Sequence, residues 1–558
     1  MSRAPRDTAG RDPALRTWER VGLAALAAIA LVIPLSLLLP VSDPAGVEVA
    51  EVEPAFVGGA ACVDCHEVAA ERWRGSHHDL AMAEATEETV LGDFDDATFT
   101  YRGVTSRFYR RDGGFFVFTE GVGGTMQEFE VTHTFGVEPL QQYLVPFPGG
   151  RMQALNVTWD TERNRWFRQY AGQDIPADDW LHWTRGGQNW NGMCAECHST
   201  NLRKGYDPAT DTYDTTWTDI DVGCEACHGP GSRHVAWANI APMARPDVPE
   251  YGLAVSTSRI SPRRMVELCA PCHSRRAELG DYDHTGTELL DHMLPSLIAE
   301  GLYHDDGQTL DEVYVYGSFL QSKMYAREVS CPDCHDSHSL KLHREGNELC
   351  LQCHQREVYD TRDHHFHKKI YEGRESDGAK CVKCHMVERP YRGIDWRADH
   401  SFRVPRPDLS AEIDTPNACT QSGCHDNKPL QWSIDAHRRW YGEARKPHFG
   451  TTFVAARAGD PSARPELVRL AESDLIAPIV RATALELLAR DPGEGGLATL
   501  RTALESDEPL LRRTAVAHAP TTEPADIERF AVLLSDPVKA VRMAAVSRVA
   551  PVPRDSLK

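Results

Sequence analysis

The stretch that decides the fold reads Trp190-Asn191-Gly192-Met193-Cys194-Ala195-Glu196-Cys197-His198. Two cysteines stand three positions apart, and a histidine follows the second one directly. This C-x-x-C-H string occurs seven times in the 558 residues. The seven strings carry Cys62/Cys65/His66, Cys194/Cys197/His198, Cys224/Cys227/His228, Cys269/Cys272/His273, Cys331/Cys334/His335, Cys350/Cys353/His354 and Cys381/Cys384/His385.

C-x-x-C-H is the attachment signature of c-type heme, in which both thiols bond to the porphyrin and the imidazole binds iron. The two-residue spacing lets one turn of chain reach two points of the porphyrin edge and place the imidazole under the metal. Zinc knuckles and disulfides also use paired cysteines. Neither requires a histidine after every pair, and only about 0.02 such strings are expected by chance. The sequence therefore predicts covalent heme.

An eighth pair, Cys419 and Cys424, is followed by His425 but has four intervening residues. Ser422 and Gly423 allow a loop that still brings both thiols to one porphyrin. The competing interpretation is a lone disulfide. With this site all sixteen cysteines are used, and the prediction is eight covalently attached c-type hemes.

Histidines outside the motifs are candidates for the sixth ligand of each iron, because low-potential electron carriers usually place a second imidazole there. The predicted sixth ligands are His78, His234, His338, His365, His367 and His400. His77, His343 and His364 also lie next to motifs and are further candidates for sixth ligands. Weaker candidates are His133, His182, His284, His292, His304, His437 and His448, whereas His518 lies in a repeat and is expected to be structural. Met82, Met324, Met386 and Lys323 are alternative axial groups, although methionine is more often core filler.

The composition excludes some functions and suggests an exported chain. A formal charge of −22 argues against nucleic-acid binding and favours small molecules or redox proteins as partners. Residues 1–20 contain five arginines, and residues 21–42 are an uncharged stretch, which is long enough to span a bilayer. We expect an uncleaved inner-membrane anchor, with a cleaved signal as the alternative, and a periplasmic location for the rest.

The chain divides into regions of different character. Residues 45–85 carry the first motif. Residues 90–185 are predicted to form a small antiparallel β insert with strands at 98–101, 106–110, 115–118, 127–134, 155–159 and 166–170, because β-forming runs alternate with glycine-rich turns. Residues 186–450 hold the other seven motifs. This spacing leaves too few residues for an ordinary apolar core, so the hemes are expected to form the core.

Residues 451–558 lack cysteine and contain a repeat. Similar strings begin at residues 480, 511 and 541, reading Val-Arg-Ala-Thr-Ala-Leu, Leu-Arg-Arg-Thr-Ala-Val and Val-Arg-Met-Ala-Ala-Val. This pattern predicts HEAT-like helix pairs, which could form a docking surface or an inert cap. The predicted fold class is mainly α, with a heme-packed domain, the β insert and the helical repeats.

Three strings resemble the multiheme cytochromes related to cytochrome c554: residues 190–201, residues 223–232 and Asp399-His400-Ser401-Phe402-Arg403-Val404-Pro405-Arg406-Pro407. The resemblance covers residues 55–430 and implies a heme-packed helical domain, histidine on both faces of most irons and periplasmic electron transfer. Residues 331–385 also resemble the heme core of multiheme nitrite reductases and octaheme hydroxylamine oxidoreductases. Those nitrite reductases use a C-x-x-C-K string, which is absent here, and the widened eighth motif also departs from the relatives' spacing.

Two functions follow as hypotheses. The first is a carrier that passes electrons between membrane donors and a terminal acceptor or partner protein. The alternative is a multiheme oxidoreductase of the nitrite, hydroxylamine or tetrathionate type, acting on a small nitrogen or sulfur compound at one open heme. Lys323, Tyr325 and Arg327 could then bind an anion or supply protons.

Overall fold

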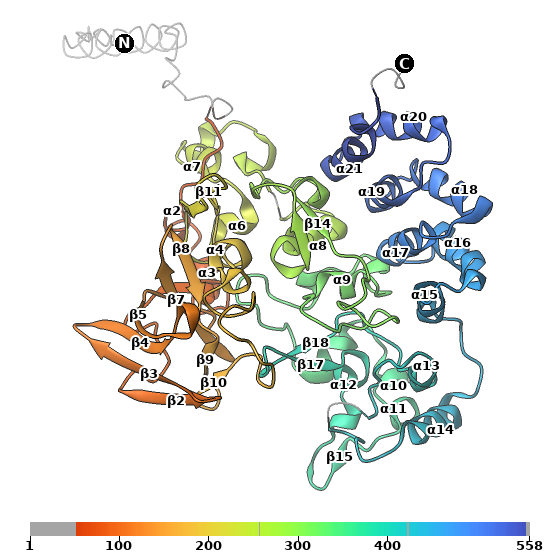
Figure 1. The fold of residues 1–558 in the computed structure, drawn as a ribbon, viewed down its shortest axis with the longest axis horizontal. Helices are drawn as coiled ribbons and strands as arrows, with labels where there is room; N and C mark the ends of the chain where they lie inside the picture. Colours follow the sequence, from red (N-terminus) through yellow and green to blue (C-terminus); the bar gives the residue numbers. More distant parts are fainter. Residues whose placement is uncertain (1–48, 50–51, 256, 421–422, 554–558) are drawn as a thin grey trace, which may run out of the picture.

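The computed structural model describes residues 49, 52–255, 257–420 and 423–553 (Figure 1). The predicted leader, residues 1–20, and the predicted anchor or signal, residues 21–42, lie outside these residues. Within the described ranges, no helix is long and apolar enough to cross a membrane. This finding does not support the prediction that an N-terminal helix anchors the protein in the inner membrane.

Two antiparallel sheets form the region between the first and second motifs (Figure 1). One has the order β1-β6-β7-β9-β10 with β8 also paired to β7, and the other has the order β2-β3-β4-β5. The strands are β1 Met82–Glu84, β2 Ala97–Tyr101, β3 Val104–Arg111, β4 Gly114–Glu120, β5 Met126–Val131, β6 His133–Phe135, β7 Leu140–Phe147, β8 Arg151–Ala154, β9 Val157–Asp160 and β10 Arg165–Arg168.

Alternating side chains explain how this β region packs. On β3, Phe108 is buried while Arg107 is exposed, as expected for successive residues on opposite faces of a strand. The ring of Phe94 is fully buried, and its centroid lies 5.6 Å from Phe108, 5.2 Å from Phe115 and 5.6 Å from Trp166. The region therefore has an aromatic core of its own that needs no heme.

The elements around the motifs are short. The helices are α2 Ala60–Val63, α3 Glu67–Trp73, α4 Trp190–Met193, α5 Ala195–His198, α6 Cys224–His228, α7 Ser232–Ala238, α8 Pro262–His273, α9 Tyr316–Phe319, α10 Arg356–Tyr359, α11 Arg362–His365, α12 Cys381–His385, α13 Pro407–Ile413 and α14 Leu430–Tyr441. Four hairpins join them: β11 Tyr206–Asp207 with β12 Thr212–Tyr213, β13 Arg276–Glu278 with β14 Met293–Pro295, β15 Ile370–Tyr371 with β16 Arg374–Glu375, and β17 Glu388–Tyr391 with β18 Asp395–Ala398.

The predicted mainly α class is wrong. Of the described residues, 38% are helical and 17% lie in strands, so the protein is a mixed α/β structure. The physical reason is that a motif needs only one turn to hold two thiols and an imidazole. Helices such as α6 and α12 therefore stop after five residues, and short hairpins fill the intervals.

The C-terminal helices pack in a row (blue in Figure 1). They are α15 Phe449–Arg457, α16 Arg464–Glu472, α17 Pro478–Leu488, α18 Gly493–Ala503, α19 Pro509–His518, α20 Pro524–Val532 and α21 Lys539–Val549. The three similar strings lie in α17, α19 and α21, which pack one against the next. The repeated sequence thus marks equivalent helices on one side of the row.

These helices share one hydrophobic core with the heme-motif region. The buried cluster runs from Val266 in α8 through Phe319 in α9 to Ile479 in α17 and Val541 in α21. At its edge Arg263 forms an ion pair with Glu508 at 3.0 Å. The C-terminal row is therefore packed directly against the helix that carries the fourth motif.

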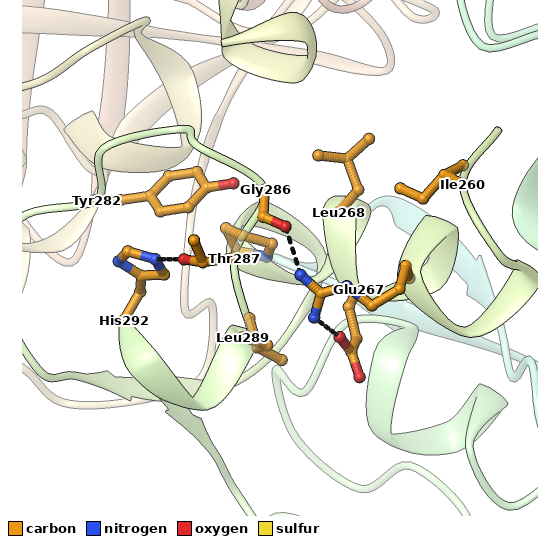
Figure 2. A pocket seen from close by; sticks show the side chains of 10 residues that line it. Ile260, Glu267, Leu268, Tyr282, Gly286, Thr287, Leu289 and His292 are labelled. Atoms are coloured by element: carbon orange, nitrogen blue, oxygen red, sulfur yellow. Dashed lines mark hydrogen bonds and ion pairs between the residues drawn. The ribbon is translucent and has the colours of Figure 1, made fainter. Parts of the chain in front are cut away.

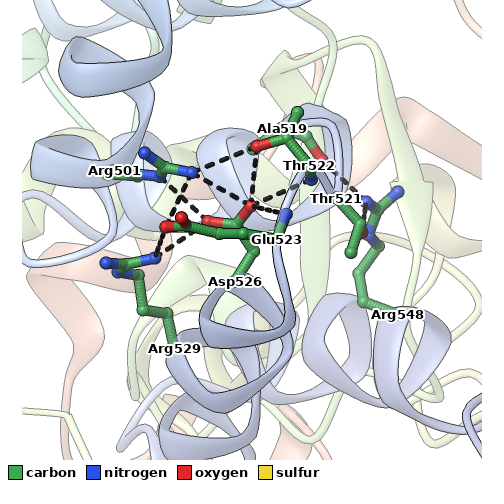
Figure 3. Close-up of polar contacts among 8 residues, drawn as sticks. All are labelled: Arg501, Ala519, Thr521, Thr522, Glu523, Asp526, Arg529 and Arg548. Carbon is green, nitrogen blue, oxygen red and sulfur yellow. Dashed lines mark hydrogen bonds and ion pairs between the residues drawn. The ribbon is translucent and has the colours of Figure 1, made fainter.

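Polar contacts also tie successive C-terminal helices together, most densely at Asp526 (Figure 3). This buried carboxylate accepts hydrogen bonds from Arg501 at 2.9 Å, Arg529 at 2.9 Å and the backbone N–H of Thr522 at 3.0 Å. Burial alone would raise the pKa of Asp526, but these hydrogen bonds outweigh it and hold the pKa well below its ordinary value.

We expect Asp526→Asn to lower the free energy of unfolding of the C-terminal helices by about 2 kcal/mol at pH 7, because charge-assisted hydrogen bonds are lost. A carboxylate with a lowered folded-state pKa stabilises above its unfolded pKa, about 3.9. The difference between variant and wild type should therefore shrink as the pH falls below about 4. Hydrogen exchange of the α20 and α21 amides measures this difference in stability. Glu528→Gln, at an exposed position of α20, is the control, and equal protection in both variants would contradict the prediction.

Candidate functional site: paired histidines at the cysteine motifs

Each motif closes a local turn that brings its histidine back over its first cysteine. The backbone N–H of the histidine donates to the carbonyl of the first cysteine in His66 at 3.0 Å, His335 at 3.1 Å and His354 at 3.0 Å. His425 makes the same bond to Cys419, also at 3.0 Å. The widened eighth motif therefore closes the hydrogen bond of the standard ones despite its two extra residues.

Five motif histidines face the ring of a second histidine that is distant in sequence. The pairs, with centroid separations, are His66 and His234 at 6.0 Å, His273 and His78 at 6.4 Å, His228 and His338 at 6.5 Å, His385 and His364 at 6.2 Å, and His425 and His367 at 6.2 Å.

These separations fit a metal ion between the rings. An imidazole nitrogen lies about 2.0–2.1 Å from a bound first-row metal and roughly 1.1 Å from its own ring centroid, so two axial imidazoles have centroids about 6.3 Å apart. All five pairs lie within 0.3 Å of that value. The chain thus holds these histidines as they would stand on the two faces of one heme iron.

Hydrogen bonds at the other ring nitrogen support the same interpretation. The Nδ1 atoms of His198, His234, His385 and His400 lie 3.2, 3.0, 2.6 and 2.9 Å from the backbone carbonyls of Ala81, Tyr251, Arg403 and Ala398. When Nδ1 carries the proton and donates it, Nε2 is left with a lone pair for a metal. The residues therefore fit axial ligation of heme.

Three histidines of these pairs, His78, His273 and His228, are held in the neutral form that binds metals. Burial, reinforced by neighbouring histidines, lowers the pKa of His78 and of His273 to about 4 each. Burial also lowers the pKa of His228. At neutral pH these rings carry no proton that would compete with a metal.

The structure places four of the six predicted sixth ligands beside a motif histidine, and His365 and His400 are the exceptions. His364, rather than His365, faces His385, and the buried Nε2 of His365 has no hydrogen-bond partner within the described residues. His335 helps to lower the pKa of His400, but no ring contact between the two is recorded in the described residues. The other predicted ligands, His78, His234, His338 and His367, each face a motif histidine.

Three motif histidines, His198, His335 and His354, face no second histidine among the described ring contacts. The ring of His198 meets Phe135 edge-on at 5.5 Å, and the exposed His354 meets Tyr359 at 5.3 Å. The residues predicted to bind an anion, Lys323, Tyr325 and Arg327, are not among the ring contacts recorded for His198 and His354. Lys323 and Arg327 are exposed, and the Tyr325 ring packs on Phe319 with centroids 5.9 Å apart.

Most of the weaker candidates are engaged by protein groups. His292 contacts Thr287 in a small cavity beside α8 (Figure 2). The remaining partners are Thr132 for His133, Thr184 for His182, Ala226 and Asn201 for His284, Pro332 for His343, Arg445 for His437 and Gly450 for His448. Met82 accepts from Trp190, and the buried Nε2 of His304 has no partner in the described chain.

Cysteines of different motifs lie side by side, which the sequence did not reveal. Thiols of different motifs lie near enough to shift each other's pKa: Cys62 with Cys224, Cys197 with Cys272, Cys269 with Cys331, and Cys350 with Cys381. Electrostatic effects on the thiol pKa also connect Cys227 with Cys269, Cys353 with Cys334, and Cys419 with Cys384. None of the sixteen forms a disulfide, and all lie in described residues. The motifs therefore form one connected set.

These features fit a multiheme c-type cytochrome with covalently bound heme c. The family described as cytochrome c554 and c-prime matches residues 61–97 and 182–229, which include the first three motifs. No curated protein matches the chain significantly.

Two solved structures are similar to this chain. The outer cell wall cytochrome OcwA has 17% identity and a TM-score of 0.46, with 82% of this chain and 99% of that chain covered. The undecaheme cytochrome from the S-layer of Carboxydothermus ferrireducens has 16% identity and a TM-score of 0.34, with 84% of this chain and 70% of that chain covered.

Proposed function

We propose that the protein is a periplasmic electron carrier with eight covalent hemes, which connects redox partner proteins. Heme 1 to heme 8 denote the groups on His66, His198, His228, His273, His335, His354, His385 and His425. When bound, each heme supplies a one-electron iron couple. The export-type composition of residues 1–42 supports the location.

The single observation that carries the proposal is the set of five histidine pairs at the separation that one iron requires. The effects that thiols of different motifs have on each other's pKa support an order of the hemes. Because each thiol bonds to a porphyrin edge, adjacent thiols hold adjacent porphyrin edges. The contacts give the order 1, 3, 4, 5, 6, 7, 8, with heme 2 attached at heme 4 through Cys197 and Cys272. Heme 4 is thus a branch point.

Exposure suggests where partners exchange electrons. Three cysteines are exposed, and they belong to hemes 1, 6 and 8: Cys65, Cys353 and Cys424. Hemes 1 and 8 are the two ends of the order. A donor at one end and an acceptor at the other would use the whole series, with the C-terminal helices as a possible docking surface.

In this proposal six hemes receive two histidines: hemes 1, 3, 4, 7 and 8 through the five ring pairs, and heme 5 through His335 and His400. Low-temperature electron paramagnetic resonance of the oxidised protein should show low-spin ferric signals that integrate to about six hemes, because two imidazoles favour the low-spin state. An anaerobic redox titration should reduce the whole heme set reversibly. A mostly high-spin protein, or a heme fraction that no mediator reduces, would contradict the proposal.

A further inference from the structure

The end of the C-terminal row leaves apolar side chains uncovered. α21 is the last helix of the row, and no helix follows it in the described residues (Figure 1). On its outer side Met543 is 44% exposed and Val546 is 52% exposed. Residues 451–558 hold no cysteine, so no heme is attached in this region to cover these side chains. Their exposure is therefore a property of the end of the row.

The equivalent positions of the earlier units are buried. In the three similar strings, Leu485 of α17, Val516 of α19 and Val546 of α21 occupy the same place. Leu485 and Val516 are both 0% exposed. α19 packs against α17, and α21 packs against α19. A helix of the next unit thus closes each unit, and Val546 is exposed because no next unit follows it.

An arginine of α21 lacks the carboxylate that its counterpart in α19 receives. Arg512 of α19 donates two hydrogen bonds to the buried carboxylate of Asp536, at 2.7 and 3.1 Å. Asp536 belongs to the following unit and lies just before α21. Arg542 of α21 is the counterpart of Arg512, and its Nη1 donates to the backbone carbonyls of Asp536 and Pro537 at 2.7 Å each. Within the described chain it forms no ion pair.

The charge of α21 is opposite in sign to that of the whole chain. The helix contains one lysine and two arginines but no acidic residue, whereas the chain carries a formal charge of −22. Lys539, Met543, Val546 and Ala550 follow one another at spacings of four, three and four residues, so they lie on one side of the helix. Arg542 borders them. We call these five residues the terminal face.

Two features argue against a second copy of this chain on the terminal face. Two α21 helices that met face to face would bring Lys539 and Arg542 of both copies together, and like charges repel. Stacking of copies in one direction would instead require a free helix at the opposite end of the row. The helix there, α15, already packs against α13 and α17. The positive charge favours a different protein with acidic groups.

We propose that the terminal face binds an amphipathic helix of a different, acidic protein. Its apolar side chains would cover Met543 and Val546, and its carboxylates would pair with Arg542 and Lys539. This helix takes the place that a further unit would occupy, with a carboxylate where Asp536 meets Arg512. Apolar anchors with polar groups around them are the usual arrangement where a helix docks on a protein. The partner would be one of the redox proteins of the proposed function, on which this inference rests.

The test uses the full holoprotein and a synthetic helix as the probe. The probe is a fluorescently labelled, hydrocarbon-stapled peptide of about 18 residues, which is five helical turns. It carries leucine along one face and glutamate on both flanks of that face. A second peptide has lysine in place of every glutamate. Fluorescence anisotropy at low salt should show saturable binding of the acidic peptide, and binding of the basic peptide weaker by about a factor of ten.

Variants of the terminal face should weaken binding of the acidic peptide. We expect Met543→Glu and Val546→Glu each to weaken it about tenfold, because both replace an apolar anchor. Arg542→Gln should weaken it about threefold at low salt and less at high salt, since surface ion pairs are screened. Leu475→Glu, at an apolar position that is 96% exposed before α17, is the matched control and should leave binding unchanged. Unchanged hydrogen exchange of α21 verifies that each variant is folded.

Three results would overturn the inference. The first is an acidic peptide that shows no saturable binding. The second is an affinity that is equal for both peptides, or unchanged in Met543→Glu and Val546→Glu. The third is a wild-type dimer in sedimentation that Val546→Glu dissociates, which assigns the terminal face to a second copy. In all three cases, complete heme attachment and reversible reduction would leave the electron-carrier proposal standing. Hemes that cannot be reduced reversibly would defeat that proposal while peptide binding persists.

Discussion

Replacing His78 by methionine is expected to interrupt electron flow between the two arms of the heme series. His78 faces His273 of heme 4, which is the branch point in the proposed order. Methionine in place of one axial histidine raises the reduction potential. An increase of about 0.2 V is a modest part of the roughly 0.8 V that axial ligands span. At about 59 mV per factor of ten, it makes onward transfer from heme 4 about 10³-fold less favourable.

Two measurements check this result. A redox titration of His78→Met should show one heme moved to higher potential, and stopped-flow oxidation should show a slow phase that the wild type lacks. His77→Met is the matched control, because His77 is adjacent and exposed. If His77→Met moves the potential and His78→Met does not, the assignment of the axial ligand is wrong.

Removing the eighth attachment site should remove one heme and leave seven. The wild-type mass is expected to equal the polypeptide plus eight hemes, and the mass of Cys419→Ser/Cys424→Ser to equal the polypeptide plus seven. The reason is that the widened motif closes the same turn as the others and its histidine faces His367 at 6.2 Å. The outcome that contradicts this is a wild-type protein with seven hemes and a disulfide between Cys419 and Cys424.

The matched control is Cys350→Ser/Cys353→Ser, which disrupts a standard motif. It too should carry seven hemes, so both double variants should have the same heme content. They should differ in the rate at which the remaining hemes exchange electrons, because heme 8 is an end of the proposed order whereas heme 6 is internal. Loss of heme 6 should slow electron exchange between hemes 1–5 and heme 7, and loss of heme 8 should not.

The attachment motifs and most β strands could be predicted from the sequence because their signals are local. A C-x-x-C-H string specifies its own turn, and the alternation around Phe108 specifies a half-buried strand. The strand β7 escaped prediction, since Pro139 and Pro146 indicate turns rather than a strand. Its buried residues nevertheless pair with β6, β8 and β9. Tertiary packing overrode the local signal there.

The partner of each iron was harder to predict, because it depends on contacts between distant segments. His364, His365 and His367 are nearly adjacent in sequence, and only the fold separates them. Phe366, with φ 58°, ends α11 in the left-handed conformation and stacks on Trp440 with centroids 4.7 Å apart. This change of chain direction at Phe366 brings His367 to His425, while His364 faces His385. Nothing in the local sequence indicates that Trp440 fixes this change of direction.

The shared core of α8 and the C-terminal helices has a mechanical consequence. Electron exchange between redox centres requires their spacing to stay constant, yet short turns and hairpins around the motifs offer little rigidity of their own. Val266 belongs to the same buried cluster as Ile479 and Val541, so the C-terminal row stiffens the helix that carries Cys269 and Cys272. In the proposed order, heme 4 meets hemes 2, 3 and 5 at this helix. The repeats would then limit how far the spacing of these four hemes can vary, although no electron passes through the repeats themselves.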